Sequence, residues 1–344
     1  MKLALALIAS LPLVACGDGG KSDSDYNTDV TTGMHDSIGT HLGELAAAAQ
    51  ELMDAAPTHA WDATADATAI TAMEAAWRKT RVAYELVEGA TAPIFPQYDV
   101  TMDERYDGFL ANELNNMADP DLFDDQGVTG MHAIERILYA PTTREEVIMF
   151  ESMLPGYTAA AWPTTDAQAM EFKTLLCQKL IDDANALHDQ WVPSVIDTEA
   201  AFQGLVGLMN EQKEKVNLAA SGEEESRYAN VTLFDLHNNL SGTKEIYGLF
   251  QSWVTSKDGG EDIDTMIEDR FDDLNTAYSS VSGDALPDVP ADWSSDAPTP
   301  ANLATPFGMM WQEVHNDVDP TMSGSAVYEM NAAAVLLGFQ PFSE

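Results

Sequence analysis

The sequence predicts an all-α protein built as two helical-bundle halves. Apolar residues recur every three or four positions through most of the chain, which is the period of a helix. Long alternating runs of β-branched residues, which are typical of strands, are absent. The helical period is clearest between residues 66 and 90, where the spaced apolar residues are Ile70, Met73, Trp77, Tyr84 and Val87.

Residues 1–15 predict a lipoprotein signal peptide. "MKLALALIASLPLVAC" has one lysine and then an apolar run that is too short to span a bilayer as a mature helix. The small residues before Cys16 resemble a bacterial lipobox, which implies cleavage at Cys16 and a lipid anchor on its thiol. Gly17 stands where an inner-membrane retention signal usually has aspartate, so the outer membrane is favoured. The alternative is an unmodified signal peptide with a chance cysteine.

Residues 16–32 are rich in Gly, Ser and Asp and predict a flexible tether. An N-terminal bundle is expected over 33–160 and a C-terminal bundle over 161–344. Pro93 and Pro96 are expected to end one helix, and Pro141 to end another. Helices are predicted near 39–56, 66–90, 130–139, 144–154, 167–191, 201–220, 231–254, 263–281 and 325–339, with a Pro-rich loop over 282–306.

The charge balance excludes one class of partner. The chain has 57 acids and 16 bases, a formal net charge of −41, whereas nucleic-acid binding needs a basic surface. The acidity is interpreted as adaptation to a salty habitat in preference to a role in metal capture. With Cys16 lipidated only Cys177 is left, so neither a disulfide nor a cysteine-rich metal site is predicted. Cys177 is expected to be a small buried hydrophobe.

The stretch "GVTGMHAIERILYAP" places His132 and Glu135 one helical turn apart, just after Gly130. Residues three apart share a helix face, so the imidazole and the carboxylate point the same way. This pair suits zinc, iron or manganese, but two ligands do not hold a metal firmly and others must come from elsewhere. The sequence has neither the HExxH motif of zinc peptidases nor the paired ExxH motifs of di-iron bundles.

The same Gly-x-His-x-x-Glu pattern occurs a second time, at Gly39, His41 and Glu44. Two occurrences in one chain show that the pattern alone is a weak signal. Because His41 lies in an Ala-rich predicted helix, it is interpreted as a solvated or packed histidine.

The surroundings separate the two occurrences. Upstream of His132, a helix carries Glu85 and Glu88 after Arg81, and Asp103 and Arg105 follow the proline turn. This ordered series resembles the imelysin family. The stretch "RYANVTLFDLHNNLSGTKEIYG" and the ending "LLGFQPF" resemble it too, so the resemblance covers the chain from Met34 onward. One departure is Gly89, which stands where the iron-uptake branch usually has a proline.

The resemblance implies two helical bundles that meet at a shared site around the Gly-x-His-x-x-Glu helix. It also implies a periplasm-facing or surface lipoprotein that takes part in iron uptake with a transporter or receptor as partner. The family's metal ligands carry over to His132 and Glu135, assisted by Glu85, Glu88 and Asp103. Arg105 would orient or neutralise a carboxylate there, and Gly130 belongs to the motif. The alternative is that Glu85 and Glu88 are solvated acids, with Arg81 pairing Glu85, and without the resemblance the two interpretations have equal weight.

Two functions follow as hypotheses, with iron as the expected metal and zinc as the alternative. The first is capture of iron, free or in a small chelate, for uptake. The second is a metallopeptidase in which a metal-bound water attacks the substrate and Glu135 is the general base. A third reading gives the site structural importance only. We favour capture, because the motif supplies a single histidine and a catalytic zinc usually has three protein ligands.

Overall fold

The computed structural model describes residues 20–111 and 118–343. Within these ranges the regular elements are all helical, so the predicted all-α fold is confirmed. No helix in this part of the chain is both long enough and apolar enough to cross a membrane. The predicted signal peptide over 1–15 and the lipid-attachment residue Cys16 lie outside the described residues.

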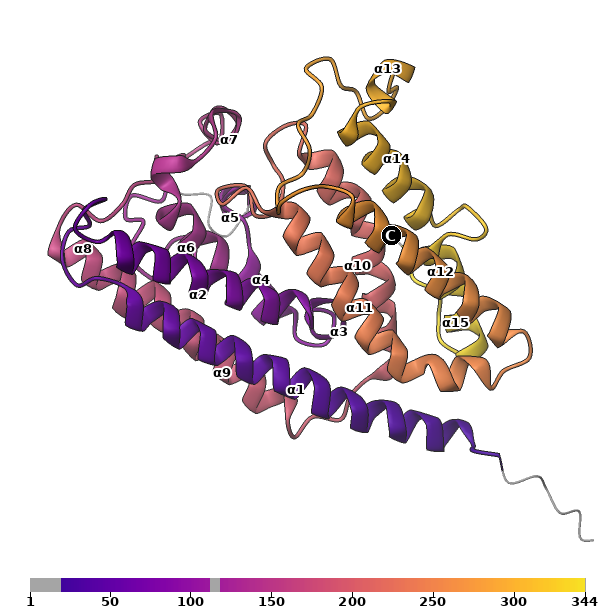
Figure 1. The fold of residues 1–344 in the computed structure, drawn as a ribbon. Coiled ribbons are helices and arrows are strands. Elements are labelled where there is room, and N and C mark those ends of the chain that lie inside the picture. Colours follow the sequence, from indigo (N-terminus) through magenta and orange to yellow (C-terminus); the bar gives the residue numbers. More distant parts are fainter. Residues whose placement is uncertain (1–19, 112–117, 344) are drawn as a thin grey trace, which may run out of the picture.

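The first half of the chain builds an elongated bundle along one edge of the molecule (Figure 1). The long helix α1 forms this edge, with α2 and α9 beside it. The elements are α1 (Asp23–Ala55), α2 (Ala67–Glu85), α3 (Glu88–Thr91), α4 (Pro96–Asp103), α5 (Tyr106–Ala111), α6 (Gly130–Leu138), the 3₁₀ turn η1 (Ala140–Thr142) and α7 (Glu145–Glu151).

The rest of the chain first returns along α1 and then builds a second bundle (Figure 1). In the second bundle α10 packs against α11, α14 and α15, and α12 packs against α11 and α15. The elements are α8 (Asp166–Glu171), the π-helical segment η2 (Phe172–Cys177), α9 (Gln178–Trp191), α10 (Thr198–Leu218), α11 (Thr232–Thr255), α12 (Gly260–Ser279), α13 (Pro300–Leu303), α14 (Pro306–Val318) and α15 (Ala326–Leu337).

The predicted tether over 16–32 is wrong from Asp23 onward, because α1 begins there. Ser22 caps the helix: its side chain accepts from the backbone N–H of Asp25, whose carboxylate accepts from the backbone N–H of Ser22. This capping box satisfies donors that the first turn leaves unpaired, and acids in the first turn suit the helix dipole. Val30 is already buried. The Ser and Asp residues that predicted a tether therefore include the cap and the first turn of a helix.

The predicted division at residues 160–161 does not match the packing. Helix α9 and the segment η2 lie against α1, which belongs to the N-terminal half. The reason is the apolar face of α9, where Leu180, Ala184 and Trp191 are buried in the same core as Ile38 of α1. The division between the two bundles therefore falls in the connection from α9 to α10.

Prolines begin helices where the sequence was expected to be a turn or a loop. Pro96 was expected to stop a helix, but it is the first residue of α4, where its missing N–H costs nothing. Pro306 likewise begins α14, with Thr305 as its cap, at the end of the segment expected to be a loop over 282–306. Asp103, the last residue of α4, owes its position to this unexpected helix.

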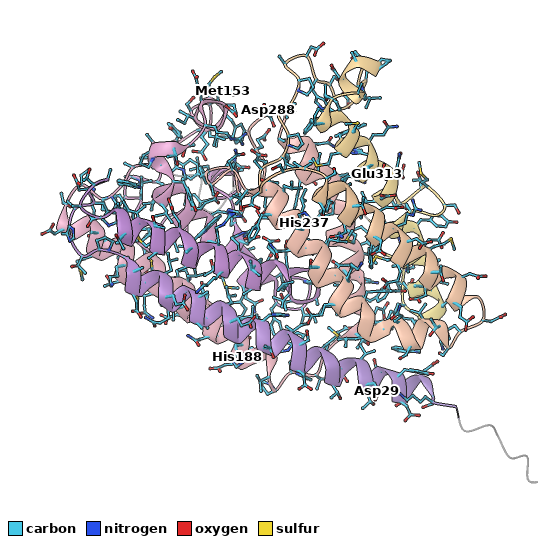
Figure 2. All side chains as sticks on the ribbon, in the orientation of Figure 1. Asp29, Met153, His188, His237, Asp288 and Glu313 are labelled. Carbon is cyan, nitrogen blue, oxygen red and sulfur yellow. The ribbon has the colours of Figure 1, made fainter. Side chains whose placement is uncertain are left out.

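One continuous apolar core joins the two bundles. It includes Cys177, which is fully buried as expected, and burial raises the pKa of its thiol to about 12. Helix α11 packs against α1, α2 and α3, and Gly242 makes this approach close, since a Cβ there would lie 2.3 Å from the carbonyl oxygen of Leu86. Side chains fill the space between helices, and exposed acids such as Asp29, Asp288 and Glu313 lie at the periphery (Figure 2).

Candidate metal centre

Three side chains from distant parts of the chain converge where the bundles meet. Asp103 ends α4, His132 lies in the first turn of α6, and Glu225 lies in the connection between α10 and α11. Gly130 begins α6 with a φ of 83°, and a Cβ there would lie 2.3 Å from the carbonyl oxygen of Met102. Glycine therefore lets the start of α6 touch the end of α4, which brings His132 beside Asp103.

These three residues, named here the donor triad, have the spacing of metal ligands. His132 Nε2 lies 3.4 Å from Asp103 Oδ1 and 3.3 Å from Glu225 Oε1. One ligand atom from each residue lies within 4.8 Å of the other two. Donors about 2.1 Å from a common ion lie about 3 to 4 Å apart in tetrahedral or octahedral geometry. The donor triad therefore fits an ion without rearrangement of the helices.

Glu135 faces the other ring nitrogen of His132. Its Oε2 lies 2.8 Å from Nδ1, and its Oε1 accepts hydrogen bonds from the backbone N–H groups of Tyr228 and Ala229, at 3.0 and 2.9 Å. The carboxylate is fully buried. This is the arrangement that fixes the tautomer and orientation of a metal-binding histidine, leaving Nε2 to face the ion. The structure thus places Glu135 behind His132, although the sequence suggested a direct ligand.

Arg81 lies between the acids of both bundles. Its guanidinium donates to Glu85 and Asp103, and its Nε lies 3.4 Å from Asp235 Oδ1. Arg81, Glu85 and Asp235 are fully buried. Because buried carboxylates are costly unless they are paired, Arg81 makes this concentration of acids compatible with a folded core. Glu85 also accepts from Asn239, so the structure engages it as a partner of Arg81 and Asn239.

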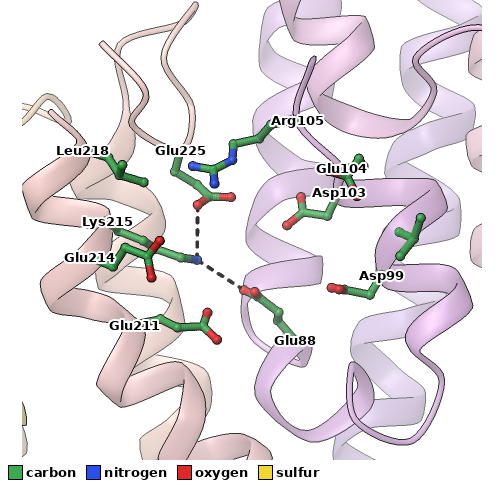
Figure 3. Close-up of a pocket in the computed structure, with 11 residues that line it drawn as sticks. Glu88, Asp99, Asp103, Glu104, Arg105, Glu211, Glu214, Lys215, Leu218 and Glu225 are labelled. Carbon is green, nitrogen blue, oxygen red and sulfur yellow. Dashed lines mark ion pairs between the residues drawn. The ribbon is translucent and has the colours of Figure 1, made fainter. Parts of the chain in front are cut away.

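An acidic cleft reaches two members of the donor triad, Asp103 and Glu225, from the surface (Figure 3). Its volume is about 310 Å³, and seven of the eleven described residues that line it are acids. Glu88 lies on the side of α3 and α4, together with Asp99, and Lys215 on α10 faces them. Arg105 also lines the cleft. Its Nη1 donates to the backbone oxygen of Glu223 at 2.9 Å, so it holds the connection that carries Glu225.

The electrostatics keep the two acids of the donor triad ionised. Burial raises the pKa of Glu225, but Lys215 and His132 outweigh it, so the pKa lies well below its usual value. Burial likewise raises the pKa of Asp103, and the charges of Arg81 and His132 reverse this and lower it. Both carboxylates are therefore ready to bind a cation at neutral pH.

Opposing effects act on the pKa of His132. Burial and the charge of Arg81 lower it, whereas Asp103 and Glu135 raise it by more, so the pKa lies well above its usual value. A metal ion bound to His132 would therefore replace a proton.

The second occurrence of the motif forms the same local pair in different surroundings. His41 Nδ1 lies 3.0 Å from Glu44, as His132 Nδ1 lies 2.8 Å from Glu135. The Nε2 of His41 faces Glu245 of α11 at 3.2 Å, and both carboxylates are largely exposed. His41 belongs to no group of three potential ligands among the described residues. What distinguishes His132 is the pair of buried acids beyond its ring.

Sequence reasoning did not name Glu225, Lys215 or Asp235 as site residues, although Asp235 lies in the stretch that resembles the family's second signature. Lys215 lies on α10 and Asp235 on α11, where each is one charge on a helix with a buried face. Glu225 follows two other glutamates in "GEEESRYAN", a run that reads as a solvated loop. Its one available signal was its position two residues before "RYANVTLFD", the stretch already singled out as part of the family's second signature.

Comparisons with known proteins agree with this architecture. An Efem/EfeO family lipoprotein of Staphylococcus haemolyticus (strain JCSC1435) is 26% identical over 299 residues, which cover 83% of this chain and 88% of that protein. The crystal structure of an imelysin-like protein from Psychrobacter arcticum 273-4 shares the fold, with a TM-score of 0.55 and 13% identity over 94% of this chain and 99% of the other. The family model described as imelysin, peptidase M75, matches residues 39–300. Because this match spans more than half of the chain, the protein belongs to the imelysin family.

Proposed function

We propose that this protein is a cell-envelope lipoprotein that binds a metal ion, iron first, for uptake. The observation that carries the proposal is the donor triad, in which His132 Nε2 lies 3.3 and 3.4 Å from two carboxylate oxygens. One imidazole with two carboxylates suits iron, manganese or zinc, and the oxygen donors favour the harder ions. Family members are associated with iron uptake, and the similar Staphylococcus protein is described as a lipoprotein, which agrees with a lipid anchor on Cys16.

The acidic cleft supports capture of a small cation. Six waters occupy about 180 Å³ at about 30 Å³ each, so a fully hydrated ion fits the cleft of about 310 Å³. The excess of acids along its walls attracts cations toward the donor triad. In this proposal Asp103, His132 and Glu225 are the ligands, Glu135 and Gly130 position His132, and Arg105 positions Glu225. Glu88 lines the cleft as an outer acid, and Glu85 pairs with Arg81.

Capture is favoured over peptide hydrolysis by the position of Glu135. A general base must reach the attacking water, directly or through one further water. Glu135 is fully buried, and both of its oxygens already accept hydrogen bonds from His132 or from the backbone. A transporter or receptor that receives the ion is part of this proposal.

The test is metal binding by the soluble form, residues 17–344. Elemental analysis and titration calorimetry with Fe(II), Fe(III)-citrate and Zn(II) should find one site per chain. His132→Ala should abolish it, because the central donor is lost. His41→Ala is the matched control, since it removes a histidine with the same local pairing, and it should leave affinity unchanged. Equal loss in both variants, or loss in neither, would contradict the assignment.

A further inference from the structure

The acidic cleft already contains a cation that belongs to the protein. The ammonium group of Lys215 lies 3.5 Å from Glu225 Oε2 and 3.7 Å from Glu88 Oε2 (Figure 3). Its side chain projects from α10 across the cleft toward α3, so it links the two bundles. Lys215 is buried and surrounded by acids, and it carries a positive charge where an incoming metal ion would arrive.

Lys215 and the donor triad share one carboxylate. Glu225 Oε1 faces His132 Nε2 at 3.3 Å, and Glu225 Oε2 faces the ammonium of Lys215 at 3.5 Å. An ion bound by the donor triad would therefore have Lys215 as a neighbouring positive charge. Two cations around one carboxylate repel each other, and the repulsion grows in proportion to the charge of the ion.

The contacts of Lys215 allow it to move. Its ion pairs of 3.5 and 3.7 Å are longer than direct hydrogen bonds. Its short contact, 3.1 Å, is with the neutral amide oxygen of Asn239. A lysine ammonium is a compact charge on a flexible stem, so the group can retreat from Glu225 while it keeps this partner.

We propose that Lys215 is a tethered counter-ion that neutralises Glu225 and Glu88 in the metal-free protein and competes with the metal for Glu225. This inference rests on the proposed function. The consequence is a weakened affinity for the ion, which suits a protein that must release its cargo to a partner. Lys215 is thus a positioning residue that sets affinity without binding the ion itself.

The experiment compares Lys215→Met with the wild-type soluble form, using Mn(II) and Tb(III) as probes. Methionine is also unbranched and is one atom shorter than lysine, so it keeps most of the side chain's apolar length and removes its charge. We expect affinity to rise about tenfold for the divalent ion and about thirtyfold for the trivalent ion, because the lost repulsion scales with ionic charge. A purely structural ion pair would give no such dependence on charge.

Two controls separate this effect from others. Lys215→Arg keeps the charge and should bind both ions with an affinity close to that of the wild type. Lys244→Met removes the same charge from an exposed pair with Asp272 on α12, and it should leave affinity almost unchanged. If Lys215→Met does not fold without metal, its thermal melts are measured with added ion. In this proposal the bound ion should replace the lost positive charge and restore folding.

The outcomes distinguish the two proposals. If the wild type binds neither these two probes nor Fe(II), Fe(III)-citrate or Zn(II) in a manner that requires His132, the proposed function fails and this inference fails with it. If His132-dependent binding is present, but Lys215→Met binds both ions no more tightly than the wild type, only the role of Lys215 is overturned. Equal gains for both ions, or a variant that stays unfolded at saturating ion, would overturn it too.

Discussion

At the scale of single residues, Glu135 acts through His132. Its carboxylate holds Nδ1 of the ring and is itself fixed by two backbone N–H groups of the connection that carries Glu225. The buried carboxylate of Glu135 therefore fixes both the orientation of the His132 ring and the position of that connection.

Glu135→Gln should weaken metal binding about 10- to 100-fold, which is the usual effect of losing a partner behind a metal-binding histidine. The amide keeps the shape of the side chain but removes the charge behind the imidazole. Titration calorimetry with Zn(II) or Fe(II) measures the effect, with the melting temperature as a check on folding. A loss as complete as that in His132→Ala would instead make Glu135 a ligand.

The local sequence pattern identified candidate site residues where they lie near His132 in the chain or belong to an ordered motif. The structure brings His132 beside Asp103, and Glu85 and Glu88 also lie beside Asp103. Their role as metal ligands stays a prediction. Glu225 could not be predicted from local pattern, because its pairing with His132 joins residues 93 positions apart through the packing of two bundles. Its position beside His132 depends on how the connection between α10 and α11 packs against α6. A polar loop has no periodic pattern from which this packing could be predicted.

At the scale of elements, short helices and close contacts position the site. Helix α4 was missed because Pro96 was interpreted only as a stop, yet Asp103 at its end is one of the donors. The long helices were predicted well, since each buries an apolar stripe over several turns. Short helices such as α3 and α5 have too few turns to show a stripe, and tertiary contacts stabilise them.

Gly130→Ala tests the contact between α6 and α4. The substitution places a Cβ 2.3 Å from the oxygen of Met102, at a φ of 83°. We expect a loss of about 2 kcal/mol or more in the free energy of unfolding, from the left-handed backbone and the displaced helix. Metal affinity should fall as well, because His132 moves away from Asp103.

The matched control for this prediction is Gly39→Ala, in the other occurrence of the motif. Gly39 lies in the interior of α1, where an added Cβ would meet Trp191 at an ordinary 3.8 Å. Alanine is the better helix former, so this variant should gain about 0.5 to 1 kcal/mol. Urea denaturation measures both. The idea fails if the two variants have the same stability or if Gly130→Ala binds metal normally.

At the scale of the whole molecule, the two bundles form one continuous core, and the site lies where they meet. The division predicted at residues 160–161 came from a Pro-containing loop, which marks a turn but does not say which helices pack together. Helix α9 pairs with α1 because both bury apolar faces in the same core. Since the proposed ligands come from both bundles, metal binding should stabilise the whole structure.

Three buried or partly buried acids should make the metal-free protein more stable at pH 6 than at pH 8. Burial raises the pKa of Asp99 to about 7 and those of Asp235 and Asp317 to about 6. In the unfolded chain the pKa of these groups is about 3.9. Between about pH 4 and 7 the folded state holds protons that the unfolded state has lost, so stability falls as pH rises through this window.

Melting temperatures measured across this pH range at constant ionic strength test the effect. A second series with added salt separates it from the general repulsion among the charges of a chain with a net charge of −41. Added sodium chloride should raise the melting temperature at pH 8 by screening exposed acids, but it acts weakly on buried ones. Asp317→Asn should reduce the fall between pH 6 and 8 without touching the donor triad, because Asp317 lies on α14 beside Arg270. A melting temperature that is constant or rises from pH 6 to 8 would show that the buried acids do not set the stability of the metal-free fold.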